Sequence, residues 1–162
     1  MESYSLEKQQ RKAQKSKFLR LVIAGFAATL AFNGVMYYDI SVTGIPLDIP
    51  TTLGQLTVGD SPISPIVGHT IHFLNGIGLA LLFGYVVVPI SKKITKMPII
   101  AYAVAFAGIE TIFGVWFGML PALGAGFAGL DISPQVPAIT MTRHIVFGLV
   151  LGAFATQWRK IQ

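Results

Sequence analysis

The sequence contains no cysteine and few charged residues. Of its 162 residues, 12% are charged and 53% are hydrophobic, whereas a soluble domain usually carries about 25% charged residues. The lack of cysteine excludes disulfides, thiolate metal sites and cysteine nucleophiles. The sequence also lacks a nucleophile elbow, a phosphate-binding loop, an HExxH zinc motif and a dinucleotide-binding glycine motif. No familiar catalytic motif is present, and we expect a protein that is not an enzyme.

Four long apolar runs dominate the remaining sequence. Each has about the 17–25 residues that a helix needs to cross roughly 30 Å of hydrocarbon. Backbone polar groups inside lipid must be hydrogen-bonded within their own segment, so each run is predicted to be a helix. The fold class is therefore all-α, a polytopic membrane four-helix bundle. The runs are 21–38, 66–90, 98–120 and 138–157, within one transmembrane domain at 18–162 that follows a basic tail at 1–17.

Positive charge is concentrated on one side of the expected membrane. With four spans, eleven of the twelve Lys and Arg residues fall on the side of the two termini, and Arg143 falls on the other. Because cytoplasmic loops are enriched in Lys and Arg, both termini are predicted to be cytoplasmic, with the protein in the cell membrane. The basic tail is expected to approach anionic lipid. Nucleic-acid binding is not expected, since no nucleic-acid motif accompanies the charge. The cations of the terminal side are Lys8, Arg11, Lys12, Lys15, Lys17, Arg20, Lys92, Lys93, Lys96, Arg159 and Lys160.

Two stretches of the chain resemble each other. They are SPISPIVGHTIHFLNG, from Ser61, and SPQVPAITMTRHIVFG, from Ser133. Both follow the pattern SPxxPxxxxxxHxxxG, in which His72 and His144 occupy the same place. Both stretches enter the membrane from the same side, so the two hairpins that contain them have the same orientation. This predicts two parallel helical-hairpin repeats, at 18–91 and 92–158.

The outer loops contain signals for helix starts. Pro65 and Pro137 fall near the beginning of the second and fourth runs, where a missing N–H costs little. In the first outer loop, DIPTTLGQL is expected to form one interfacial helical turn with Asp48 near its N-terminal cap.

Each expected span carries one polar side chain, and at 1.5 Å per residue all four fall at a similar depth. Residues four apart share a helix face, and small residues follow Glu110 and the two histidines at that spacing. Such residues let membrane helices approach closely, so the polar groups are predicted to point into the bundle. The predicted polar layer comprises Asn33, His72, Glu110 and His144, with His69, Asn75 and Arg143 at its periphery. Arg143 is interpreted as an outer-surface anchor or the partner of an outer aspartate.

Four interpretations of the polar layer remain open. One is that the four groups satisfy one another and fix the helix register. A second is a metal site made of His72, His144 and Glu110, since this ligand set recurs around zinc and imidazole also suits copper and iron. A third is ligation of haem b by the two histidines. A fourth is a path for protons or small solutes, which intramembrane Glu and His commonly mark.

Several short segments resemble an uncharacterised family of small bacterial and archaeal four-helix membrane proteins. They are AGFAATLAFNGVM, DIPTTLG, HFLNGIGLALLFGYVVVP and HIVFGLVLGAF. In that family a histidine opens the second and fourth helices and glycine follows four residues later, as at His72–Gly76 and His144–Gly148. The resemblance covers about residues 20–157 and implies no particular activity.

The expected function is that of a small integral membrane protein. It would associate through its glycine-rich faces with itself, or serve as a non-enzymatic accessory subunit of a larger membrane complex of the respiratory or monooxygenase type. The alternative is that the His/Glu layer binds a metal, haem or a small solute, or relays protons.

Overall fold

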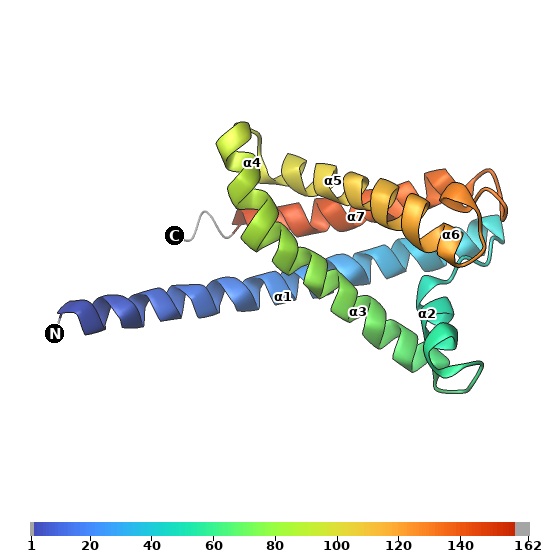
Figure 1. Ribbon diagram of the computed structural model, residues 1–162, viewed down its shortest axis with the longest axis horizontal. Helices are drawn as coiled ribbons and strands as arrows, with labels where there is room; N and C mark the ends of the chain where they lie inside the picture. The colour runs from blue at the N-terminus through green and yellow to red at the C-terminus, as the bar shows by residue number, and fades with distance from the viewer. Residues whose placement is uncertain (1, 158–162) are drawn as a thin grey trace.

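The computed structural model describes residues 2–157, which are almost entirely helical and include no strand (Figure 1). Four helical rods are long and apolar enough to cross a membrane, which confirms the predicted spans: Leu6–Thr43, Ser64–Ile94, Ile99–Ala122 and Val136–Thr156. The predicted cations Arg159 and Lys160 lie outside the described residues. In chain order the elements are α1 (Glu2–Thr43), α2 (Ile49–Val58), α3 (Ser64–Leu82), the π-helix η1 (Phe83–Val87), α4 (Val88–Ile94), α5 (Ile99–Glu110), the π-helix η2 (Thr111–Met119), α6 (Leu120–Ala122), the 3₁₀-helix η3 (Phe127–Gly129) and α7 (Val136–Gln157).

The basic tail is not separate from the first span. α1 is a single helix of 42 residues, and its N-terminal part projects beyond the other helices (Figure 1). The tail is rich in Glu, Lys, Gln and Arg, which are good helix formers. At 1.5 Å per residue the rod is roughly 60 Å long, about twice the thickness of a hydrocarbon core.

Two of the spans contain a π-helical segment just before a proline. Pro89 lies two residues beyond η1, and Pro121 lies two residues beyond η2. A proline inside a helix has no N–H to donate, and its ring crowds the carbonyl four residues earlier. The wider turns of a π-helix accommodate both defects within a membrane span. Since η2 begins directly after Glu110, it also determines where the rest of that span points.

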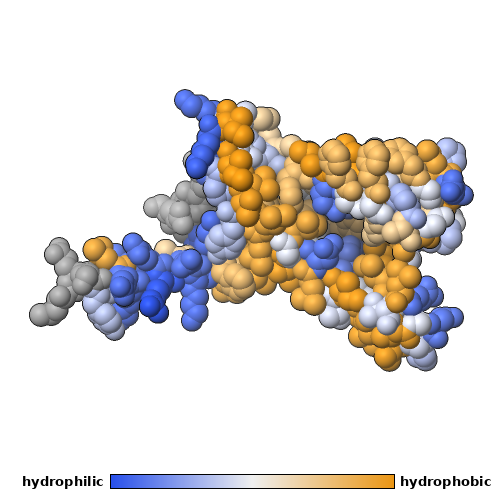
Figure 2. Space-filling view, viewed as in Figure 1, coloured by the Kyte–Doolittle hydropathy of each residue, from blue (hydrophilic) through white to orange (hydrophobic). Residues whose placement is uncertain are grey.

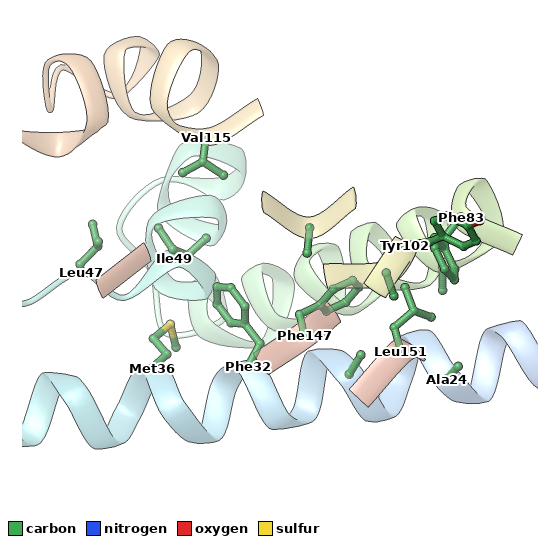
Figure 3. Packing of buried hydrophobic residues seen from close by; sticks show 14 of the residues in the cluster. Ala24, Phe32, Met36, Leu47, Ile49, Phe83, Tyr102, Val115, Phe147 and Leu151 are labelled. Atoms are coloured by element: carbon green, nitrogen blue, oxygen red, sulfur yellow. The ribbon is translucent and has the colours of Figure 1, made fainter. Parts of the chain in front are cut away.

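The four spans do not close into a regular bundle. α1 packs along α3 and α7, and α5 packs along α7, but α5 meets the second span chiefly at η1. From there α3 and α5 diverge toward the opposite end (Figure 1). The buried core follows this shape: Phe83, Tyr102 and Leu151 lie toward one end, while Met36 and Leu47 lie toward the other (Figure 3). α3 and α5 are therefore farthest apart at the end of the molecule opposite η1 (Figure 1).

The small-residue faces below the two histidines pack as predicted. A Cβ at Gly148 would lie 2.8 Å from the carbonyl oxygen of Ala103. A Cβ at Gly25 of α1 would lie 2.8 Å from the carbonyl oxygen of Gly76, on the face below His72. The corresponding prediction for the face below Glu110 is wrong, because Gly114 and Gly118 are exposed. They lie within η2, where wider turns move residues four apart off a common face.

The expected helix in the first outer loop is present and longer than one turn. α2 begins after Asp48, whose carboxylate accepts a hydrogen bond of 3.0 Å from the backbone N–H of Thr51. This satisfies one of the free N–H groups of the first turn. α2 packs closely on α3, because glycine stands at the crossing on both helices.

The described ends of the chain lie at one end of the molecule. The start of α1, the end of α7 and the connection from α4 to α5 are all there (Figure 1). Figure 2 shows hydrophilic residues gathered at this end and at the opposite one, with hydrophobic surface between them. This is the surface of a multi-pass membrane protein that contacts lipid around its middle.

Candidate functional site

Phe32 brings the two predicted histidines to one level. Its ring, on α1, makes edge contacts with both imidazoles: the centroid distance is 5.0 Å to His72 on α3 and 4.9 Å to His144 on α7. The residue after Phe32 is Asn33, which is also buried. The polar layer is therefore assembled around α1, which touches both of the other helices.

Glu110 and His144 form the one close pair within the layer. Oε2 of Glu110 lies 3.2 Å from Nε2 of His144, and Nδ1 of His144 lies 2.7 Å from the carbonyl oxygen of Thr140. Because a carbonyl oxygen only accepts, Nδ1 carries a proton. The Nε2 edge of the imidazole then faces the Glu110 carboxylate.

Three polar atoms of the layer are buried without a hydrogen-bond partner in the described part of the chain. They are Oδ1 of Asn33, Nδ1 of His72 and Oε2 of Glu110; the Glu110 oxygen is near His144 but is not aligned with it as a hydrogen bond. A buried polar atom without a partner costs about 1–3 kcal/mol. Apart from the close approach of Glu110 to His144, the four groups therefore do not satisfy one another in the described part of the chain. A purely structural layer would require that they did.

A cavity of about 300 Å³ borders the layer. Figure 2 shows the hollow between the arm formed by α5 and α6 and the arm formed by α2 and α3. A smaller cavity of about 30 Å³ lies deeper, beside Thr29 and Gly76, and is large enough for a water molecule. Both cavities have His72, Asn75, Glu110, His144 and Phe32 on their walls.

The remaining predicted residues have separate roles. Asn33 lines neither cavity. His69 lies one turn from His72 and pairs with the hydroxyl of Tyr37 at 2.9 Å. Asn75 is exposed and faces both cavities.

Arg143 is not an outer-surface anchor, because it is 1% exposed. Its second predicted role is confirmed: Nε donates to Oδ2 of Asp39 at 2.7 Å, and Nη2 donates to Oδ1 of the same carboxylate. Nη1 donates to the carbonyl oxygen of Leu47 at 2.8 Å. The sequence contained a signal for this pair, since both residues fall near the outer end of their spans.

The predicted metal set is not assembled. Within residues 2–157, no three side chains of His, Cys, Asp or Glu are grouped so that they could hold a metal ion. Glu110 approaches His144, while the imidazole of His72 packs on the edge of Phe32.

The fold and the buried layer together define a small multi-pass membrane protein with polar groups inside it. The model of a family of unknown function, DUF6789, matches residues 16–162, and the chain belongs to this family. The match begins inside α1 and includes the whole of the other three spans. Neither a search of curated proteins nor a search of solved structures gave a match. What the protein does must therefore be argued from its own site.

Proposed function

We propose that the protein is a non-enzymatic membrane protein that binds a small molecule in the 300 Å³ cavity. The observation that carries this proposal concerns Nδ1 of His72 and Oε2 of Glu110. Both atoms are buried, neither has a hydrogen-bond partner among residues 2–157, and both belong to side chains that form the cavity wall. A bound molecule that forms hydrogen bonds with both would remove their desolvation cost.

The cavity wall indicates the chemical class of this molecule. Ile49, Leu53, Val115 and Met119 supply an apolar surface, and the polar groups are gathered at the inner end. The volume is at the lower limit of known ligand pockets. These features suit a lipid-soluble molecule with one small polar group, such as a carbonyl or hydroxyl, that enters from the bilayer between α3 and α5.

Comparing the small molecules that co-purify with matched variants tests this proposal. The wild type, His72→Phe, Glu110→Gln, the double variant and the control His69→Phe would be purified in mild detergent and examined by native mass spectrometry. His69 is a suitable control because it lies outside both cavities. We expect one small molecule on the wild type and the control, with a loss of about tenfold or more in the double variant, since two hydrogen bonds each contribute about 1 kcal/mol.

Size-exclusion chromatography would show that each variant remains folded. The proposal would be overturned if no small molecule accompanied the folded wild type, or if the same amount accompanied the double variant.

A second candidate is the role of an accessory subunit, in an oligomer or a larger membrane complex. It is favoured by the exposed face of η2, where Phe113 and Phe117 are 69% and 62% exposed beside the exposed Gly114 and Gly118. Glycine on an outward face permits another helix to approach closely. The mass of the intact assembly in the same native spectra tests this role, and a monomer at every detergent concentration would contradict it.

We also infer that the basic end faces the cytoplasm and that the two hairpins arose by duplication. The first inference is supported by the charge distribution. The second is supported by the shared SPxxP pattern, whose Pro65 and Pro137 lie in the first turns of α3 and α7, and by the similar pairing of α1 with α3 and of α5 with α7.

A further inference from the structure

A third cavity lies at the basic end of the molecule, away from the polar layer. Its volume is about 430 Å³, and it is formed by α1, the η1–α4 segment, the start of α5 and the end of α7. None of its lining residues lines the two cavities of the polar layer. It is therefore an independent site.

Three cations lie on the wall of this basic-end cavity: Lys17, Arg20 and Lys92. No acidic residue lines it, and in the described part of the chain none of the three cations forms an ion pair. Nζ of Lys17 lies 4.4 Å from the ring centroid of Tyr85, which is within the range of a cation–π contact. Cations from two separate elements thus converge on one space with no anion to balance them.

The rest of the wall is apolar. It contains Leu21, Phe83, Val88, Ile99 and Ala155. Arg20 and Leu21 are neighbours at the point where the first apolar run begins, so the cavity lies at the boundary between headgroups and hydrocarbon if α1 crosses the membrane there. Its two kinds of wall match the two parts of a phospholipid.

We propose that the basic-end cavity binds an anionic phospholipid, with the phosphate between Lys17, Arg20 and Lys92 and the start of an acyl chain against Phe83 and Val88. Lys and Arg bind phosphate through charge-assisted hydrogen bonds, and basic recesses between membrane helices bind anionic lipid headgroups. A free phosphate ion would use the cations but would leave the apolar wall uncovered.

Native mass spectrometry of the full-length chain in detergent tests the proposal. The probes are dioleoylphosphatidylglycerol, dioleoylphosphatidylcholine and inorganic phosphate, each titrated at the same ionic strength. The test variant is Lys17→Gln/Arg20→Gln/Lys92→Gln. The control, Lys12→Gln/Lys15→Gln/Lys96→Gln, removes the same charge from exposed residues outside the cavity. A second test variant, Val88→Trp, fills the apolar part and keeps every cation.

We expect phosphatidylglycerol to bind the wild type and the control more tightly than phosphatidylcholine does. The cavity triple variant should bind it about tenfold or more less tightly, since it removes all three cations that would face the headgroup. Val88→Trp should also weaken the binding. Equal losses in the two triple variants would overturn the proposal, as would equal binding of the two lipids. Binding of inorganic phosphate alone, with no preference for phosphatidylglycerol, would assign the cavity to a free anion and would equally overturn it.

Discussion

At the scale of single residues, the ion pair between Arg143 and Asp39 holds together the half of the molecule opposite the termini. The guanidinium joins three separate parts of the chain, since it lies on α7, its carboxylate partner lies on α1, and its third acceptor is the carbonyl of Leu47. A charged side chain inside a membrane protein is costly unless it is paired. The bidentate geometry supplies that pairing together with a defined orientation.

Arg143→Met should therefore destabilise the protein by about 3–5 kcal/mol, because it leaves the Asp39 carboxylate without its partner. The double variant Asp39→Leu/Arg143→Met should be less destabilised than Arg143→Met alone, since it removes both charges. Denaturant-induced unfolding in detergent micelles would measure both. A double variant at least as unstable as the single one would show that the pair is not the main contribution of these residues.

Asn33 is expected to behave differently from the cavity residues. Its Oδ1 is buried without a partner, and it lines neither cavity. Asn33→Leu should raise the free energy of unfolding by about 1 kcal/mol, because it removes an unsatisfied polar group at similar volume, and it should leave the co-purifying molecule in place. Thermal unfolding and native mass spectrometry would measure the two effects; a loss of the bound molecule would place Asn33 within the binding site.

At the scale of elements, the crossing of α2 over α3 depends on two glycines. A Cβ at Gly54 would collide with the backbone carbonyl of Ser64, and one at Gly68 would collide with that of Pro50. The collisions are with main-chain atoms on both sides, so no side-chain rotation can relieve them. The position of α2 in turn places Ile49 and Leu53 on the wall of the larger cavity.

Gly68→Ala should accordingly displace α2 and destabilise the protein by about 1–3 kcal/mol, the usual cost of overpacking. Gly78→Ala, on the same helix, is the matched control, because a Cβ there would meet nothing within 4 Å. Because alanine has a higher helix propensity than glycine, Gly78→Ala should leave the stability of the protein unchanged or raise it slightly. Comparing melting temperatures in detergent would separate the two; equal melting temperatures would mean that the crossing can shift without loss.

The sequence predicts those features of the elements that depend on residues close together in the chain, and it does not predict those that depend on tertiary packing. The four spans follow from apolar runs and the need to bond the backbone locally, and the cap at Asp48 follows from a local signal. The exposure of Gly114 depends on a π-helix, and the orphaned Nδ1 of His72 depends on the divergence of α3 from α5. The regular spacing of an α-helix predicts neither feature. The exposure of Gly114 results from a change of that spacing in the π-helix, and the environment of His72 results from the tertiary arrangement of α3 and α5.

At the scale of the whole molecule, the absence of cysteine makes the orientation in the membrane directly measurable. Lys12, in the N-terminal part of α1, and Asp60, between α2 and α3, are both exposed. These two segments lie at opposite ends of the molecule (Figure 1). With Asp60→Cys, a maleimide that cannot cross membranes should label intact cells. With Lys12→Cys it should label only after permeabilisation, because the basic end is proposed to be cytoplasmic. The opposite labelling pattern would show that the protein has the reverse orientation. The wild-type protein, which has no cysteine, is the control for background labelling of both variants.

The continuity of α1 has a mechanical consequence. No break separates its projecting N-terminal part from Phe32, whose ring touches both imidazoles. A continuous helix transmits a tilt along its whole length. A tilt of the projecting part of α1 would therefore also move the Phe32 ring between the two histidines.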